Sequence, residues 1–141
     1  MYKRILITTD GSNKSRLDAK DGIELAKALG AQVIALNVVS ENVIASAVRQ
    51  LGSDRKDAEA MLKARGQKAI DEIKKMGDDA GIKVDAVLKI GVPANEIIEV
   101  ASSEKVDLIV IGSHGESGEQ SIGGVVRKVV YLSTTPVLVV R

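Results

Sequence analysis

Two short segments of the chain carry residue types that could bind a ligand. The first, "TTDGS" at residues 8–12, offers one carboxylate and three hydroxyls. The second, "GSHGESGEQSIGG" at residues 112–124, has five glycines in thirteen residues. Glycine lets a backbone turn tightly and approach a ligand, and the N–H groups of such a turn suit phosphate. The two segments therefore predict an anion-binding cleft, provided that the fold brings them together.

Neither segment matches a standard catalytic or nucleotide fingerprint. The glycine-rich segment lacks G-x-G-x-x-G, and Gly123 is followed by Gly124 and Val125 where a P-loop needs Lys and a hydroxyl. An aspartyl-phosphate phosphatase would place its nucleophile at position 8, which is Thr8. His114 is the single histidine, so no His-based metal site is expected, and no G-x-S-x-G elbow supplies a serine nucleophile. These patterns exclude hydride transfer, P-loop phosphoryl transfer and serine hydrolysis.

Four polar residues in or near these segments have two interpretations each. Asp10 either caps the turn and the helix after it or contacts the ligand. His114 is either an exposed or backbone-bonded loop residue or a catalyst. Arg127 and Lys128 either lie on a solvated helix face or reach a phosphate.

Five short apolar runs, rich in β-branched residues, predict strands. Three of them are almost continuously apolar, as strands covered on both faces are. Another alternates apolar and polar residues, which suits an edge strand. In chain order the runs cover residues 4–8, 32–39, 83–91 (the alternating run), 107–112 and 136–140.

Helical patterns separate these strands. Ser12 has the residue type of an N-cap for a first helix, which ends where Gly30 suits a left-handed C-cap. The longest helix extends from Asp54 to about Ala80, and Pro93 can open the next at its first position. A further helix is expected at residues 123–132.

The alternation of strands and helices predicts a single α/β domain over residues 1–141. We expect a doubly wound parallel sheet of Rossmann or flavodoxin type, with strand order 3-2-1-4-5 and helices on both faces. For residues 40–53 the sequence allows two conformations, a short helix or a mobile irregular segment. Gly52, Gly66, Gly77 and Gly81 are interpreted as helix interruptions and ends rather than as site residues.

The composition narrows the classes of partner. Twenty Lys and Arg balance 19 Asp and Glu among 141 residues, so no basic surface for nucleic acid is expected. The absence of cysteine excludes disulfides and thiolate chemistry and favours a reducing compartment, the cytoplasm. The apolar runs are too short for a membrane span, and the amino terminus does not have the pattern of a signal peptide.

Taken together, these pieces resemble the universal stress protein family over almost the whole chain. "ILITTDGS" is similar to the opening strand and acidic turn of the family, "ALNVV" to its second strand and "GVPANEI" to its turn into a helix. "VDLIVIGSHG" followed by "PVLVV" is the most specific part. The resemblance implies an adenine nucleotide alpha hydrolase-like fold and a dimer formed by antiparallel pairing of the last strands. The interface would be Pro136, Val137, Leu138, Val139 and Val140.

The resemblance also implies binding of ATP or AMP, with Mg²⁺ possible beside ATP. Asp10 and Val38 would flank the adenosine, and glycines of the G-x-x-G, nine residues, G-[ST] motif would face the phosphates. The complete set carried over to this sequence is Thr9, Asp10, Val38, Gly112, Ser113, Gly115, Gly123, Gly124 and Val125.

The sequence departs from that motif in three ways. Only seven residues separate Gly115 from Gly123, and Gly124 stands where the family has Ser or Thr. The segment between these glycines contains Glu116 and Glu119 but no Lys or Arg, so a triphosphate would meet like charge. Three functions therefore stay open. They are a dimeric stress-response module that binds nucleotide, a dimeric scaffold that has lost nucleotide binding, and a slow ATPase that uses His114 or Glu116.

Overall fold

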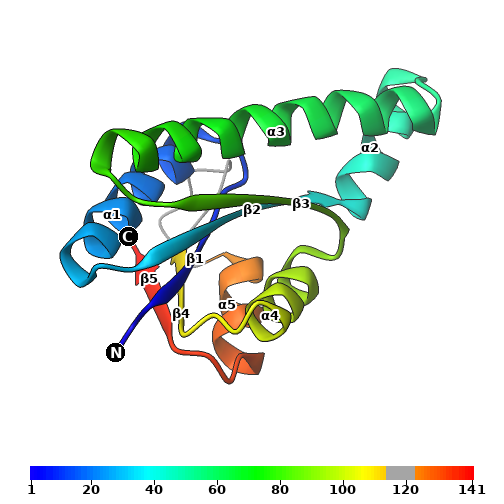
Figure 1. Cartoon of the computed structure of the whole chain (residues 1–141). Coiled ribbons are helices and arrows are strands. Elements are labelled where there is room, and N and C mark those ends of the chain that lie inside the picture. The colour runs from blue at the N-terminus through cyan, green and yellow to red at the C-terminus, as the bar shows by residue number, and fades with distance from the viewer. Residues whose placement is uncertain (114–122) are drawn as a thin grey trace.

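The computed structural model describes residues 1–113 and 123–141. Strands and helices alternate along most of the chain, as the sequence predicts (Figure 1). The elements are β1 (Arg4–Thr8), α1 (Asn13–Leu29), β2 (Gln32–Ser40), α2 (Glu41–Leu51), α3 (Arg55–Ala80), β3 (Val84–Gly91), α4 (Pro93–Ser103), β4 (Leu108–Gly112), α5 (Gly124–Leu132) and β5 (Val137–Val140).

The five strands form one parallel sheet with the order β3-β2-β1-β4-β5. The predicted fold class and strand order are confirmed. The order reverses at β1, which pairs with β2 on one side and with β4 on the other. Loops that follow β1 and β4 therefore leave the same edge of the sheet side by side, where ligands of such sheets collect.

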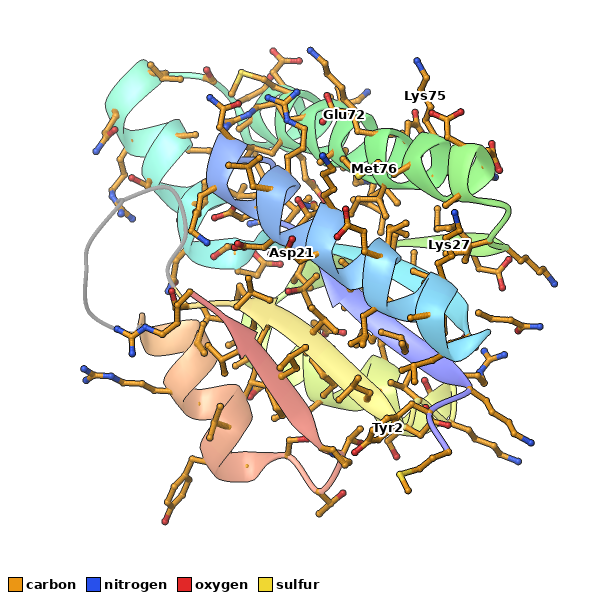
Figure 2. All side chains as sticks on the ribbon, turned by 90° about the vertical axis from the view of Figure 1, so that its left-hand side faces the viewer. Tyr2, Asp21, Lys27, Glu72, Lys75 and Met76 are labelled. Atoms are coloured by element: carbon orange, nitrogen blue, oxygen red, sulfur yellow. The ribbon has the colours of Figure 1, made fainter. Side chains whose placement is uncertain are left out.

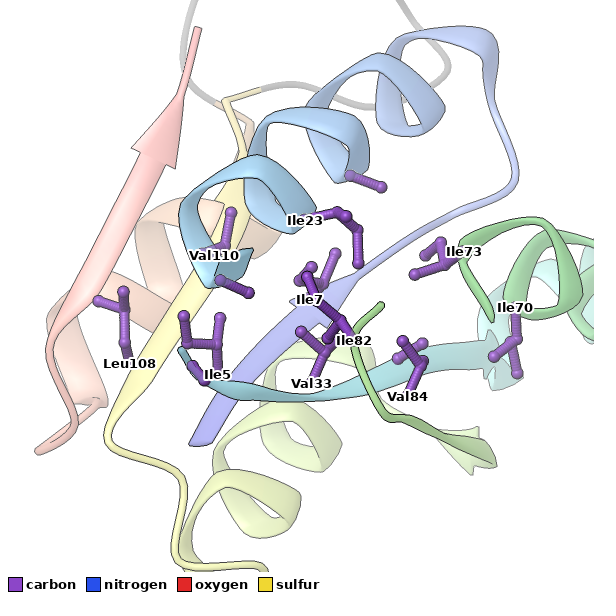
Figure 3. Packing of buried hydrophobic residues seen from close by; sticks show 14 residues of the cluster. Ile5, Ile7, Ile23, Val33, Ile70, Ile73, Ile82, Val84, Leu108 and Val110 are labelled. Carbon is purple, nitrogen blue, oxygen red and sulfur yellow. The ribbon is translucent and has the colours of Figure 1, made fainter. Parts of the chain in front are cut away.

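Helices cover both faces of the sheet, α1 and α3 on one and α4 and α5 on the other (Figure 1). The first layer buries Ile5, Ile7, Val33 and Val110 of the sheet against Ile23 of α1 and its neighbours (Figure 3). Figure 2 shows this face from outside, with α1 beside α3. The opposite layer is built in the same way from aliphatic residues of α4 and α5. Because both faces of the central strands are buried, their near-continuous apolarity is explained.

Capping residues set the ends of the helices as expected. The Ser12 side chain accepts a hydrogen bond from the backbone N–H of Ser15 at 3.1 Å. Gly30 ends α1 with a φ of 66°, a left-handed conformation that glycine adopts without a steric penalty. Pro93 takes the first turn of α4.

The open segment at residues 40–53 contains a helix, α2, capped by Ser40. Its Ile44 is buried together with Ala58 of α3. Glu41 accepts a hydrogen bond from Arg55 at 2.8 Å, and this bond raises the pKa of the guanidinium. The sequence alone did not decide between a helix and an irregular segment here. The apolar stripe of α2 packs on α3, and a local sequence pattern does not show that contact.

The interpretation of Gly66 and Gly77 as helix interruptions was wrong. Both are buried inside an unbroken α3. A Cβ on Gly77 would lie 2.2 Å from a methyl carbon of Val84, and one on Gly66 would lie 2.3 Å from the Oδ1 of Asn37. The two glycines let α3 approach the sheet closely.

Candidate functional site

A cavity of about 460 Å³ lies at the carboxyl ends of β1, β2 and β4. This is the position that the strand order predicts for a ligand. Its volume is within the usual range for small-molecule sites. The described residues that line it are Thr8, Thr9, Asp10, Ser15, Leu36, Asn37, Val38, Val39, Ser40, Val43, Leu62, Arg65, Gly66, Pro93, Ile97, Ile111, Gly112, Gly123, Gly124, Val125 and Val126.

The acidic turn, residues 8–12, is held by its own side chains. Thr9 Oγ1 lies 2.9 Å from Ser15 Oγ and accepts the backbone N–H of Gly11 at 3.1 Å. The Asp10 carboxylate accepts the backbone N–H of Ser12 at 2.9 Å. Gly11 has a φ of 83°, which a residue with a side chain adopts only under strain. Asp10 thus stabilises the turn and also lines the cavity, so the two interpretations of this residue are compatible.

Asn37, in the second half of β2, connects the acidic turn to the sheet. Its side-chain Nδ2 donates to the backbone carbonyl of Thr9 at 2.8 Å, and the residue is only 5% exposed. The other side of this amide faces Gly66 of α3. Asn37 was not among the predicted site residues, because an isolated Asn in an apolar run gives no signal of its partner.

At the end of β4, two backbone N–H groups are used inside the protein. The N–H of Ser113 donates to the carbonyl of Val140 at 2.8 Å, and that of Gly123 donates to the carbonyl of Ser113 at 2.7 Å. Ser113 itself is 2% exposed. These bonds join the beginning of α5 to β4 and β5, and they remove the Gly123 N–H from the donors that a ligand could use.

At Gly112, β4 lies close to Asp18 of α1. A Cβ at Gly112 would lie 2.2 Å from the Oδ2 of Asp18. The Asp18 carboxylate is buried and pairs with Lys14 through its other oxygen, while Oδ2 has no hydrogen-bond partner among the described residues. A side chain at this position would therefore displace the Asp18 carboxylate.

The first turn of α5 faces the cavity with Gly124, Val125 and Val126. No side chain in the described part of the chain caps this helix at Gly123. The first N–H groups of an α-helix have no acceptor within the helix. By contrast, α1, α2 and α3 are capped by Ser12, Ser40 and Asp54, while α4, which begins with Pro93, has no side-chain cap either. The open α5 terminus is therefore suited to an anionic acceptor.

Comparison with known proteins identifies the family of the chain. The model of the universal stress protein family matches residues 1–141, the whole chain. The chain belongs to the universal stress protein family. Universal stress protein MJ0531 of Methanocaldococcus jannaschii is 41% identical over 143 residues, which cover 100% of this chain and 83% of the relative.

Solved structures show the same fold. The structure of protein MJ0577, from the same organism, superposes with a TM-score of 0.82 at 33% identity and covers 99% of this chain and 96% of its own. A universal stress protein family protein of Arabidopsis thaliana, solved with AMP bound, has a TM-score of 0.71 at 15% identity, with 98% and 90% of the two chains covered. At 15% identity, the likeness to the Arabidopsis protein shows the fold alone.

The fold brings most of the predicted site residues of this universal stress protein domain to one cavity. Ser113 is the exception among those described, since it is buried behind the wall. Gly115, His114, Glu116 and Glu119 lie outside the described residues. The predicted residues that line the cavity are Thr9, Asp10, Val38, Gly112, Gly123, Gly124 and Val125.

Several wall residues were not predicted because they come from helices whose position the sequence left open. Val43 belongs to α2, and Leu62, Arg65 and Gly66 belong to α3. Arg65 shares one helix face with Ala69, four residues on, and Ala69 is buried. That spacing was the only feature of the sequence that could have indicated a position of Arg65 on the inner face of α3.

Charge in the described wall is sparse. Asp10 and Arg65 are its charged residues, and the rest is apolar or neutral. Within residues 1–113 and 123–141, no three histidine or acidic side chains gather into a group that could hold a metal ion.

The helices of these two ranges do not meet the requirements of a membrane span. None of them combines the length and apolarity that a membrane crossing needs.

Proposed function

We propose that this universal stress protein binds an adenine nucleotide, ATP or AMP, in the cavity at the carboxyl ends of β1, β2 and β4. The uncapped amino terminus of α5, directed at this cavity, is the observation that carries the proposal. It supplies backbone N–H donors and the positive end of the helix dipole for phosphate.

The rest of the wall suits the nucleoside. Val38, Val43 and Leu62 offer apolar surface for a base, and Asp10 provides a carboxylate for ribose hydroxyls. The AMP bound to the Arabidopsis relative is consistent with this chemistry. Mg²⁺, where it accompanies ATP, would be held mainly by the phosphates, because the described wall has one carboxylate residue.

Calorimetric titration with ATP and with AMP, each with and without Mg²⁺, tests the proposal. We expect saturable binding of at least one nucleotide. No heat at millimolar nucleotide would refute it and favour the dimeric scaffold instead.

A substitution at the α5 terminus makes the test specific. Gly123 has the extended backbone of an N-cap, with φ −71° and ψ 165°. In Gly123→Asp, the new carboxylate would cap the open N–H groups and repel phosphate, so thermal stability should be kept or raised while nucleotide binding is lost. The control Ser102→Asp adds the same charge to an exposed position at the far end of α4 and should bind normally.

We further propose that the protein is a dimer formed through β5. This strand is at the edge of the sheet, and Leu138 on it is 42% exposed. An unpaired, apolar edge strand is a ready site for pairing with a second chain. Leu138→Lys should sediment as a monomer, whereas an unchanged dimer would refute this interface. Val139 is a poorer position for the test because it packs against the core.

A further inference from the structure

The central part of α3 passes directly over the acidic turn. A Cβ on Gly11 would lie 3.8 Å from the Cβ of Ala69. Arg65 precedes Ala69 by one helical turn and shares its face, and Arg65 lines the cavity. Arg65 and Asp10 therefore line the same cavity, one from α3 and the other from the acidic turn.

The position of Arg65 depends on the glycine that follows it. A Cβ on Gly66 would lie 2.3 Å from the Oδ1 of Asn37 and 2.9 Å from a methyl carbon of Leu88. Only glycine permits this distance between helix and sheet. The close approach at Gly66 brings the preceding residue to the carboxyl edge of β2, where the cavity opens.

Arg65 is also the cationic residue of the described wall. The first turn of α5 contributes neutral N–H groups, and residues 114–122 contain two Glu and no Lys or Arg. A nucleotide carries one or more negative charges that the site has to balance. A guanidinium presents five N–H donors in a planar fork that fits phosphate.

We propose that Arg65 binds the phosphate of the nucleotide and makes the cleft selective for nucleotides over nucleosides. The inference rests on the proposed function and adds to it the source of the positive charge. In this arrangement phosphate lies between the α5 terminus on one wall and the guanidinium of α3 on the other.

Calorimetry of Arg65→Gln against ATP, AMP and adenosine tests the inference. A hydrogen-bonded charge contact predicts that ATP and AMP bind about 10- to 100-fold more weakly while adenosine affinity is unchanged. Arg65→Lys, which keeps the charge, should recover part of the loss. The salt dependence of ATP binding should be steeper for the parent than for Arg65→Gln. The control Lys63→Gln removes the same charge from the opposite side of α3 and should leave all three affinities unchanged.

Two results would overturn the inference while the proposed function stands. They are equal ATP affinity in the parent and Arg65→Gln, and an equal loss for adenosine, which would mean that Arg65 maintains the shape of the cavity. A parent protein that binds none of the three compounds would overturn the proposed function and this inference with it.

Discussion

The two sides of the cavity differ in how their polar groups are satisfied. In the acidic turn, Thr9 and Asp10 accept hydrogen bonds from backbone N–H groups of the same turn, and Asn37 binds the Thr9 carbonyl. At the start of α5, the first-turn N–H groups have no side-chain cap within the described residues. Both sides follow central strands of the same sheet and open into the same cavity. The acidic turn is thus completed by bonds within the protein, whereas the α5 terminus has the free donors on which our proposal of a bound nucleotide rests.

Changes that disturb the acidic turn should therefore reduce stability, and changes at the start of α5 should affect binding. The largest effect is expected for Asn37→Asp. This isosteric change replaces a buried donor with a carboxylate that faces the Thr9 carbonyl, and it should cost more than about 3 kcal/mol at neutral pH. Urea unfolding at pH 7 measures the loss, and a variant as stable as the parent would show that Asn37 does not anchor the turn.

The same variant has a defined pH dependence. Burial raises the folded-state pKa of the introduced carboxyl above its unfolded value of about 3.9. Its protonated form can donate to the Thr9 carbonyl, so the folded state favours the proton. The stability deficit relative to the parent should therefore shrink as the pH falls toward about 4 and grow as the pH rises through the folded-state pKa. A deficit that does not change with pH would point to a packing defect instead.

An intermediate effect is expected for Gly112→Ala. The new methyl would overlap the Asp18 carboxylate, and overpacking of this kind typically costs about 1–3 kcal/mol. Combining it with Asp18→Ala should recover much of the loss, since the two side chains would no longer compete for one space. Gly124→Ala is the matched control because a Cβ there meets nothing within 4 Å. Additive losses in the double variant would contradict this account.

The smallest effect on stability is expected for Gly124→Ser. The position is open, so the free energy of unfolding should change by less than about 0.5 kcal/mol. The new hydroxyl can donate to phosphate, and ATP should bind about tenfold more tightly. Thermal unfolding and calorimetry measure the two quantities separately. An unchanged affinity would indicate that phosphate does not reach the start of α5.

Particular residues show how far the sequence predicts this site. Ser12 and Gly30 were predicted as caps because a cap depends on residues a few positions away. Thr9, Asp10 and Gly112 were placed at the cavity by strand order and by the family resemblance. Asn37 was missed, since its partner Thr9 is 28 residues away in the chain. Its role depends on how β2 and the acidic turn meet in space.

The sequence by itself determined the alternation of strands and helices, the parallel sheet and the edge at which a ligand would lie. These follow from short-range apolar periodicity and from the handedness of crossovers. Only the tertiary structure decided that α2 is a helix, that Gly66 is a packing residue and that Arg65 lines the cavity. The physical reason is that each of these depends on the distance between α3 and its neighbours, which contacts between distant segments determine.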